Sequence, residues 1–261
     1  MKKLLVSYSN CQGSGALFFL KRTHLAEEYE MRQWNNWQCM LDEVDPQAML
    51  KDATQADVFL YQPTDRFESR AGFNVPSTDE IKSLLVPDGC QCISFAYAYN
   101  DGFFPLLKHG DWKTGNRAKE LAAISPYRLF AAYNADLTYD CARRFVECLS
   151  EMSKREQLCD IKMVPFILNT YRDTRLFLNE NHPSSFMFCH LAQQIYIQIK
   201  SESPDVTKML TADENEVNLP MGINPTHQSV VNELGLRYLA DERAHEFYRN
   251  WFEQYLKEMK P

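Results

Sequence analysis

Glycine is scarce in this chain, with nine residues in 261, and no apolar run approaches the roughly 18 residues that a membrane-spanning helix needs. Only a short apolar stretch follows the two lysines at the N-terminus, so no signal peptide is expected. Basic side chains are outnumbered by acidic ones, 28 to 35, which leaves a net charge of −7. Because nucleic acid binds clustered cations, it is excluded as the main partner. These absences predict a cytoplasmic protein without an integral membrane segment.

The eight cysteines lack the spacing of a metal or disulfide motif. No two of them are separated by two residues, as zinc ribbons and redox dithiols require. A chain of this length without an export signal does not need a disulfide framework. We therefore predict no metal site and expect most of the cysteines to be buried as small hydrophobic side chains. Cys11 is the exception, because of its neighbours.

Short apolar segments alternate with helical ones in the first 110 residues. Strands are expected at 3–8, 29–34, 56–62 and 90–97, and the polar segment 9–15 reads as a loop before a helix at 16–20. Asp45-Pro46 and the Ser77–Glu80 capping box indicate two further helix starts. This alternation predicts an α/β fold with a parallel sheet in a three-layer core.

The second part of the chain has a helical pattern. Periodic apolar positions predict helices at 137–154, 183–200 and 238–260, and the acidic segment 201–218 is expected to be a loop or lid. We predict a single domain over 1–261, in which an α/β core at 1–110 carries the site loops. A mostly helical portion at 111–261 packs on this core. The sequence makes no prediction of the oligomeric state.

The turn around Cys11 has the composition of a reactive site. Cys11 is expected between a strand end and a helix start, where unpaired backbone amides and the helix dipole favour a thiolate and can bind an oxyanion. Asn10 and Gln12 add side-chain amides, and Gly13 allows a ligand to approach the backbone closely. The alternative is a buried structural cysteine in a tight turn.

His182 is the second candidate. Pro183 holds it in an extended conformation, and Ser184 or Ser185 can cap the helix that follows. A helix dipole disfavours a positive charge there, so the imidazole is expected to be neutral and able to accept a proton. The alternative is an ordinary histidine in a helix-entry turn.

Side-chain amides also follow the third and fourth predicted strands, at Gln62 and at Asn100. In a parallel sheet these loops project toward the same edge as Cys11. They are suited to bind a carbonyl group or a sugar hydroxyl, and equally to simple turn formation.

Together these motifs resemble the WcbI-like polysaccharide biosynthesis proteins. The likeness covers about residues 3–237 in consistent order. It rests on Asn10-Cys11-Gln12-Gly13 after a strand, Gln62-Pro63, the segment 99–105, Asn181-His182-Pro183 and the late segment 225–236. The family is also loosely similar to SGNH-type hydrolases. The resemblance implies an SGNH- or flavodoxin-like strand order and an O-acetyltransferase. This enzyme would use coenzyme A, as acetyl-CoA, to acetylate a sugar hydroxyl in surface or capsular polysaccharide biosynthesis.

The resemblance also implies roles for individual residues. Cys11 and His182 are the expected catalytic pair, with Gln12 and Gln62 as oxyanion donors. The expected cofactor ligands are Ser9, Asn10, Gly13, Asn100, Asn181 and Arg66. For the phosphates of coenzyme A, the basic candidates near the predicted loops are Lys21, Arg22, Arg66 and Arg70, whose alternative role is solvated surface charge.

The chain departs from the hydrolase pattern in three ways. No Gly-x-Asn-Asp motif follows the third predicted strand, where Gln62-Pro63-Thr64-Asp65 stands instead. Cys11 stands where a serine is usual, and Asn179 stands three residues before His182 in place of an aspartate. If Asn179 orients the imidazole, it does so by a hydrogen bond without charge.

Two other functions are open at this stage. The same site can hydrolyse an acyl ester or thioester if water reaches the acyl group. A non-catalytic module that binds carbohydrate or nucleotide is the third hypothesis. It would use aromatic side chains that lie in polar stretches, namely Trp34, Trp37 and Trp112.

Overall fold

The computed structural model describes residues 2–104, 140–210, 226 and 228–238. The chain divides into two compact units. The first comprises Met1–Ala98, Met152–Pro165 and Pro183–Pro220, and the second comprises Tyr99–Glu151, Phe166–His182 and Met221–Pro261. Outside the described residues lie Trp112, the predicted helix beyond Tyr238 and residues 211–218 of the predicted lid. The described part of that lid, 201–210, contains the short helix α11 (Thr207–Leu210).

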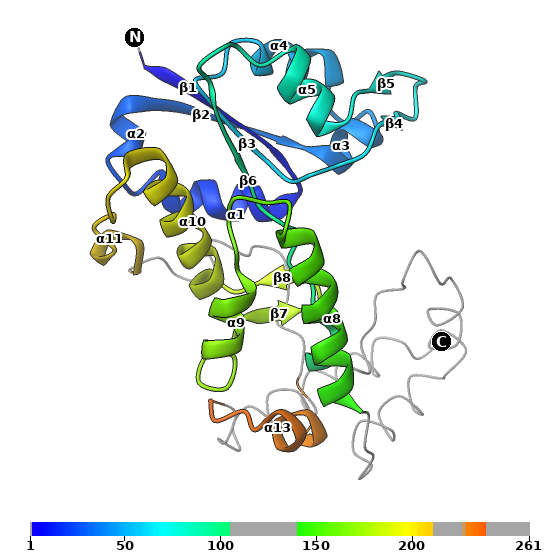
Figure 1. The fold of residues 1–261 in the computed structure, drawn as a ribbon, viewed down its shortest axis with the longest axis vertical. Helices are drawn as coiled ribbons and strands as arrows, with labels where there is room; N and C mark the ends of the chain where they lie inside the picture. Colours follow the sequence, from blue (N-terminus) through cyan, green and yellow to red (C-terminus); the bar gives the residue numbers. More distant parts are fainter. Residues whose placement is uncertain (1, 105–139, 211–225, 227, 239–261) are drawn as a thin grey trace, which may run out of the picture. The chain divides into compact units, whose positions relative to one another are not determined.

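The first unit is built on a four-stranded parallel sheet. Its strands are β1 (Lys3–Ser9), β2 (Tyr29–Asn35), β3 (Val58–Tyr61) and β6 (Gln91–Ser94), in the order β2-β1-β3-β6 (Figure 1). This confirms the predicted α/β class and a flavodoxin-like strand order. The chain moves to one side of β1 for β2 and to the other side for β3. The sheet therefore has its topological switch point between β1 and β3.

One face of this sheet carries an apolar core. Val6 and Tyr8 of β1 lie beside Phe59 and Tyr61 of β3, since alternate residues of a strand share a face. Against them pack residues from α3 (Asn36–Met40), α4 (Pro46–Ala53) and α5 (Thr78–Leu84), and Figure 1 shows α4 and α5 on this side. Full burial of side chains of this size stabilises the fold by roughly 1.5–3 kcal/mol each.

The opposite face is covered by α1 (Cys11–Leu20) and α10 (Ser185–Lys200), which makes three layers (Figure 1). Gly13 of α1 sits on the strand hydroxyls: a Cβ there would lie 1.8 Å from Ser9 Oγ and 2.8 Å from Ser7 Oγ. One turn later a Cβ on Gly15 would lie 2.6 Å from the Phe188 ring of α10. Both glycines are therefore required by close packing of α1 on its neighbours.

The expectation of a loop at 9–15 was wrong, because α1 begins at Cys11. Asn10 has an extended backbone and its side-chain oxygen accepts a hydrogen bond from Gln12 N, which makes it the N-cap. Gly13 and Gly15 lower the intrinsic helix propensity, and this suggested a loop. Contacts with the sheet and with α10 outweigh that preference.

The predicted helix starts are confirmed. Asp45 caps α4 through Gln47 N, and Ser77 and Glu80 form a reciprocal capping box at α5. For α10, whose start was expected near Pro183, the cap is Ser184, whose hydroxyl accepts from Met187 N.

Apart from the long helix α8, which was predicted at 137–154, the remaining elements are short. They are α2 (Leu25–Glu28), β4 (Phe67–Glu68), β5 (Asn74–Val75), η1 (Asp101–Phe103), α8 (Cys141–Glu156), α9 (Val164–Thr170), β7 (Phe177–Asn179), β8 (His182–Pro183), α11 (Thr207–Leu210) and α13 (Gln228–Leu234). Within the ranges that the structure describes, no helix is both long and apolar enough to cross a membrane.

Candidate functional site

Cys11 lies at the switch point of the sheet, directly after β1 and one residue inside α1. Crevices at the carboxyl ends of parallel strands, at such a switch point, are where open α/β sheets bind their ligands. Cys11 is partly exposed, whereas the neighbouring residues Gln12 and Gly13 are buried. The structure therefore places the predicted thiol at the predicted edge, within reach of solvent.

Most amides at the start of α1 already have partners. Gln12 N donates to Asn10 Oδ1 at 2.9 Å, and Gly13 N donates to Asn10 O at 3.1 Å. The Cys11 amide has a different role, because it favours the charged form of its own thiol and so lowers the pKa of that thiol. An oxyanion at this turn would therefore meet the Cys11 N–H, since the Gln12 N–H is used by the cap.

Gln62 and Gln12 tie the turn to its surroundings. The Gln62 side chain accepts from Asn10 N at 2.9 Å, and its nitrogen donates to Gln12 Oε1 at 3.4 Å. The Gln12 side chain in turn donates to Ala98 O at 2.7 Å and accepts from Ala98 N at 2.9 Å. Both glutamines are buried, so their contacts hold Cys11 in place from β3 and from the segment after β6.

The environment of Cys11 favours the thiol. Burial raises the pKa of the Cys11 thiol above its ordinary value, and the hydrogen bond from its own amide lowers it by a smaller amount. The prediction that this turn favours the thiolate was wrong, because removal of solvent outweighs the amide and the helix end. At neutral pH the sulfur is protonated.

The predicted ligands Ser9 and Gly13 are enclosed by protein. Ser9 is buried, and its hydroxyl lies 3.2 Å from Ser7 Oγ and accepts from Gln33 Nε2 at 3.1 Å. The close approach expected at Gly13 is made by these same strand side chains. Asn10, by contrast, is partly exposed.

His182 lies in the second unit and is neutral. It is buried in β8, and burial lowers the pKa of its imidazole. The predicted neutrality is confirmed, although desolvation is the cause and not a helix dipole. In the described part of the chain Nδ1 has no hydrogen-bond partner. Asn179 does not orient this nitrogen, since its side-chain oxygen accepts from Asn181 N at 3.1 Å.

Asn100, also in the second unit, is used internally. Its side chain is fully buried, donates to Phe145 O at 3.2 Å and accepts from Gly102 N at 2.9 Å. Its backbone N donates to Glu180 O at 2.7 Å. These bonds shape the turn before η1, which is the simpler of the two roles considered for it.

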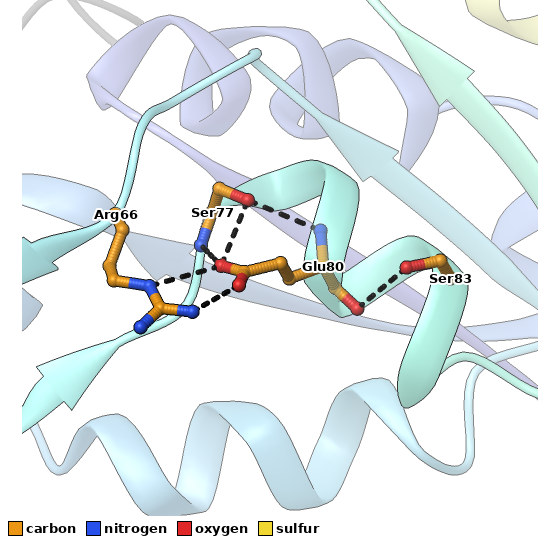
Figure 2. Close-up of polar contacts among 4 residues, drawn as sticks. All are labelled: Arg66, Ser77, Glu80 and Ser83. Carbon is orange, nitrogen blue, oxygen red and sulfur yellow. Dashed lines mark hydrogen bonds and ion pairs between the residues drawn. The ribbon is translucent and has the colours of Figure 1, made fainter.

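Arg66 is already paired. Figure 2 shows its guanidinium against the Glu80 carboxylate, which also accepts from Ser77 N at 2.9 Å. These contacts, with Arg66 the largest cause, lower the pKa of Glu80 to about 2. A phosphate would have to displace Glu80 to bind Arg66.

Lys21 and Arg22 do not lie near the strand-end loops, contrary to the prediction. They follow the last turn of α1, and a helix of ten residues is about 15 Å long. They are thus at the opposite end of the helix from Cys11. The Arg22 guanidinium is 3.7 Å from the centre of the Phe18 ring, and it donates to Phe18 O.

The sequence did not reveal the polar contacts beside Cys11. Ser14, one turn further along α1, lies 3.4 Å from Asn35 Oδ1, and Asn35 donates to Gln38 Oε1 at 2.8 Å. These contacts depend on the register of β1 and β2, which pairs Ser9 with Asn35. The sequence does not specify this register.

In the second unit, the sequence also missed a buried ion pair. Arg144 and Asp101 are 2.7 Å apart, and Cys148 and Tyr99 also contact the Asp101 carboxylate. For metals, the described residues contain no group of three or more His, Cys, Asp or Glu side chains placed to bind one.

The comparisons with known proteins agree on one family. Residues 4–203 match the family described as "Polysaccharide biosynthesis enzyme WcbI". A solved structure is similar with a TM-score of 0.63 and 19% identity, over 82% of this chain and 74% of that one. It is described as native WcbI, a polysaccharide biosynthesis enzyme, without a disulfide bond between coenzyme A and one of its cysteines. No curated protein matches significantly. The similarity to SGNH-type hydrolases stays a prediction.

Proposed function

Because the chain belongs to the WcbI family of polysaccharide biosynthesis enzymes, we propose that it transfers an acetyl group from acetyl-CoA to a sugar hydroxyl at the Cys11 turn. The observation that carries the proposal is the partly exposed Cys11 thiol beside its own amide N–H at the switch point of the sheet. The description of the similar structure names coenzyme A together with one of its cysteines, which supports coenzyme A as the ligand.

Two routes are compatible with such a site. In the first, Cys11 Sγ attacks the thioester carbonyl and loses its proton, and the sulfur of coenzyme A leaves and takes up a proton. The sugar hydroxyl then attacks the acetyl-cysteine and restores the thiol. In the second route, the sugar attacks acetyl-CoA directly. In both, the carbonyl oxygen becomes an oxyanion, and a single well-placed donor is typically worth about 3–4 kcal/mol.

The residues at the Cys11 turn are given different roles in this proposal. The Cys11 N–H is the backbone donor for the oxyanion, and the partly exposed Asn10 side chain is the second. Gln12 and Gln62 act as positioning residues, because their side chains are occupied by Asn10 and Ala98. His182 stays the predicted base, as the family resemblance implies, and its neutral imidazole is able to accept a proton.

The first test measures release of free thiol from acetyl-CoA with and without a panel of sugars and nucleotide-activated sugars. An acetyltransferase releases thiol much faster with the correct acceptor. A rate that no acceptor changes would assign the site to hydrolysis instead. Acetylation of Cys11 in acid-quenched samples, measured by mass spectrometry, separates the two routes.

The second test replaces the thiol. Cys11→Ala is expected to lower turnover at least about a hundredfold, the usual loss when a nucleophile or general base is removed. Cys90→Ser is the matched control, since Cys90 is a partly exposed cysteine of the same unit that lies outside the turn. Unchanged turnover in folded Cys11→Ala would refute a catalytic role for the thiol.

A further inference from the structure

An aromatic and cationic surface adjoins the Cys11 turn within the first unit. It consists of Trp37, Met40 and Leu41, of and just after α3, together with Arg70 in the turn between β4 and β5; we call it the α3 face. The exposed fractions of Trp37, Met40 and Leu41 are 42%, 38% and 45%. These are high values for large hydrophobic side chains that follow one another along a single helix.

The register of the sheet places this face beside the thiol. Ser9 pairs with Asn35, so α1 and α3 both begin at the same edge of the sheet within two residues of these partners. The contacts of Ser14 with Asn35, and of Asn35 with Gln38, join the two helices. α3 has five residues and is about 7 Å long.

Arg70 is held at the far end of this face. Its backbone N donates to Met40 O at 2.9 Å, and the adjacent Ala71 N donates to the Asp42 carboxylate, so the β4–β5 turn is fastened to the end of α3. Figure 1 shows this hairpin beside α3. The Arg70 side chain is exposed and makes no ion pair with the residues that the structure describes.

The other predicted phosphate ligands are less available. Arg66 is bound to Glu80, and Lys21 and Arg22 lie at the opposite end of α1. Coenzyme A has its thiol at one end and, at the other, an adenine ring with phosphates. The exposed indole of Trp37 and the Arg70 guanidinium, which has no ion pair among the described residues, complement the adenine ring and the phosphates.

We propose that the nucleotide end of coenzyme A binds the α3 face, with the adenine ring against Trp37 and a phosphate on Arg70. This inference rests on the proposed function and assigns its cofactor a direction, from the Cys11 turn outward along α3. Asn35, the partner of Ser9 in the sheet, and Gln38, which accepts from Asn35, offer polar side chains beside the α3 face to the amides of the pantetheine arm.

The test is calorimetric titration of the full chain with coenzyme A, 3′-dephospho-coenzyme A and pantetheine. Arg70→Gln is expected to weaken coenzyme A binding about tenfold, as for loss of a charge-assisted hydrogen bond, and to leave pantetheine unchanged. Trp37→Ala is expected to weaken both nucleotide ligands about fivefold and to spare pantetheine. Lys51→Gln on α4 and Leu84→Ala on α5 are the matched controls for an exposed cation and an exposed apolar side chain.

The outcomes separate this inference from the proposed function. If the unaltered chain does not bind coenzyme A, the proposed function fails and the inference fails with it. If it binds and both α3-face variants stay within about twofold of it, only the inference is overturned. The same holds if Trp37→Ala raises the KM for the sugar acceptor while coenzyme A affinity is unchanged, because the aromatic ring then belongs to the acceptor.

Discussion

Cys11 shows how opposing effects at one side chain are decided by their magnitude. A helix start and a nearby amide both favour the thiolate, and these were visible in the sequence. Partial burial in a turn packed by Gln62 and Gln12 opposes them and is larger, so the pKa of Cys11 is raised. A thiol in this state would need a base to take its proton before it could act as a nucleophile.

The raised pKa of Cys11 predicts how alkylation of this cysteine depends on pH. Only the thiolate reacts with iodoacetamide, so the rate at Cys11 should be low near neutral pH and rise through an inflection above that of free cysteine. Peptide-resolved mass spectrometry distinguishes Cys11 from the other partly exposed cysteines, and free cysteine serves as the reference. An inflection below that of free cysteine would contradict the effect of burial described here.

At the scale of elements, α1 packs closely on its neighbours because two of its residues, Gly13 and Gly15, have no side chain. Gly13 brings the helix onto the strand hydroxyls, and Gly15 brings it onto the ring of Phe188. This close approach also sets where Cys11 emerges at the end of the sheet. In a chain with few glycines, these two are explained by helix packing and not by a ligand loop.

Gly15→Ala is therefore expected to destabilise the fold. The added Cβ would lie 2.6 Å from a Phe188 ring that is buried, and overpacking costs typically 1–3 kcal/mol. Alanine has a higher helix propensity than glycine, which offsets up to about 1 kcal/mol of this cost. The expected net loss is about 1–2 kcal/mol in the free energy of unfolding, measured by urea denaturation.

The control for this prediction is a second substitution. With Phe188→Leu the ring is gone, so adding Gly15→Ala should cost little or even stabilise, which a double-mutant cycle detects. An equal cost of Gly15→Ala in both backgrounds would show that the ring contact is not its cause.

At the scale of the whole molecule, the net charge does not favour the binding of coenzyme A. A net charge of −7 does not attract phosphates, so any binding of coenzyme A must come from local groups and not from the overall field. The contacts that we propose for that binding lie in the first unit, which contains the Cys11 turn, α1 and α3.

Coenzyme A is expected to stabilise the chain against heat. A ligand at about 100 times its Kd adds about 2.7 kcal/mol to the free energy of unfolding, which raises Tm by several degrees in a protein of this size. The measurement is a thermal-shift series up to millimolar coenzyme A, with ATP at equal concentration as the control. An equal shift with both, or none with coenzyme A, would contradict specific binding.

The sequence by itself determined the features that depend on neighbouring residues. The four parallel strands, the caps of α4 and α5 and the place of Cys11 after β1 were all predictable, because strand patterns and caps involve residues a few positions apart. The resemblance to the WcbI family rested on the same local motifs.

Tertiary structure alone decided which polar groups are available for chemistry. Gln62 binds Asn10 across 52 positions of the chain, and Gln12 binds Ala98 across 86. The pairing of Arg66 with Glu80 and the register that sets Asn35 beside Ser9 were equally hidden. The physical reason is that hydrogen bonding and desolvation depend on which groups meet in space, and those partners come from segments far apart in the sequence.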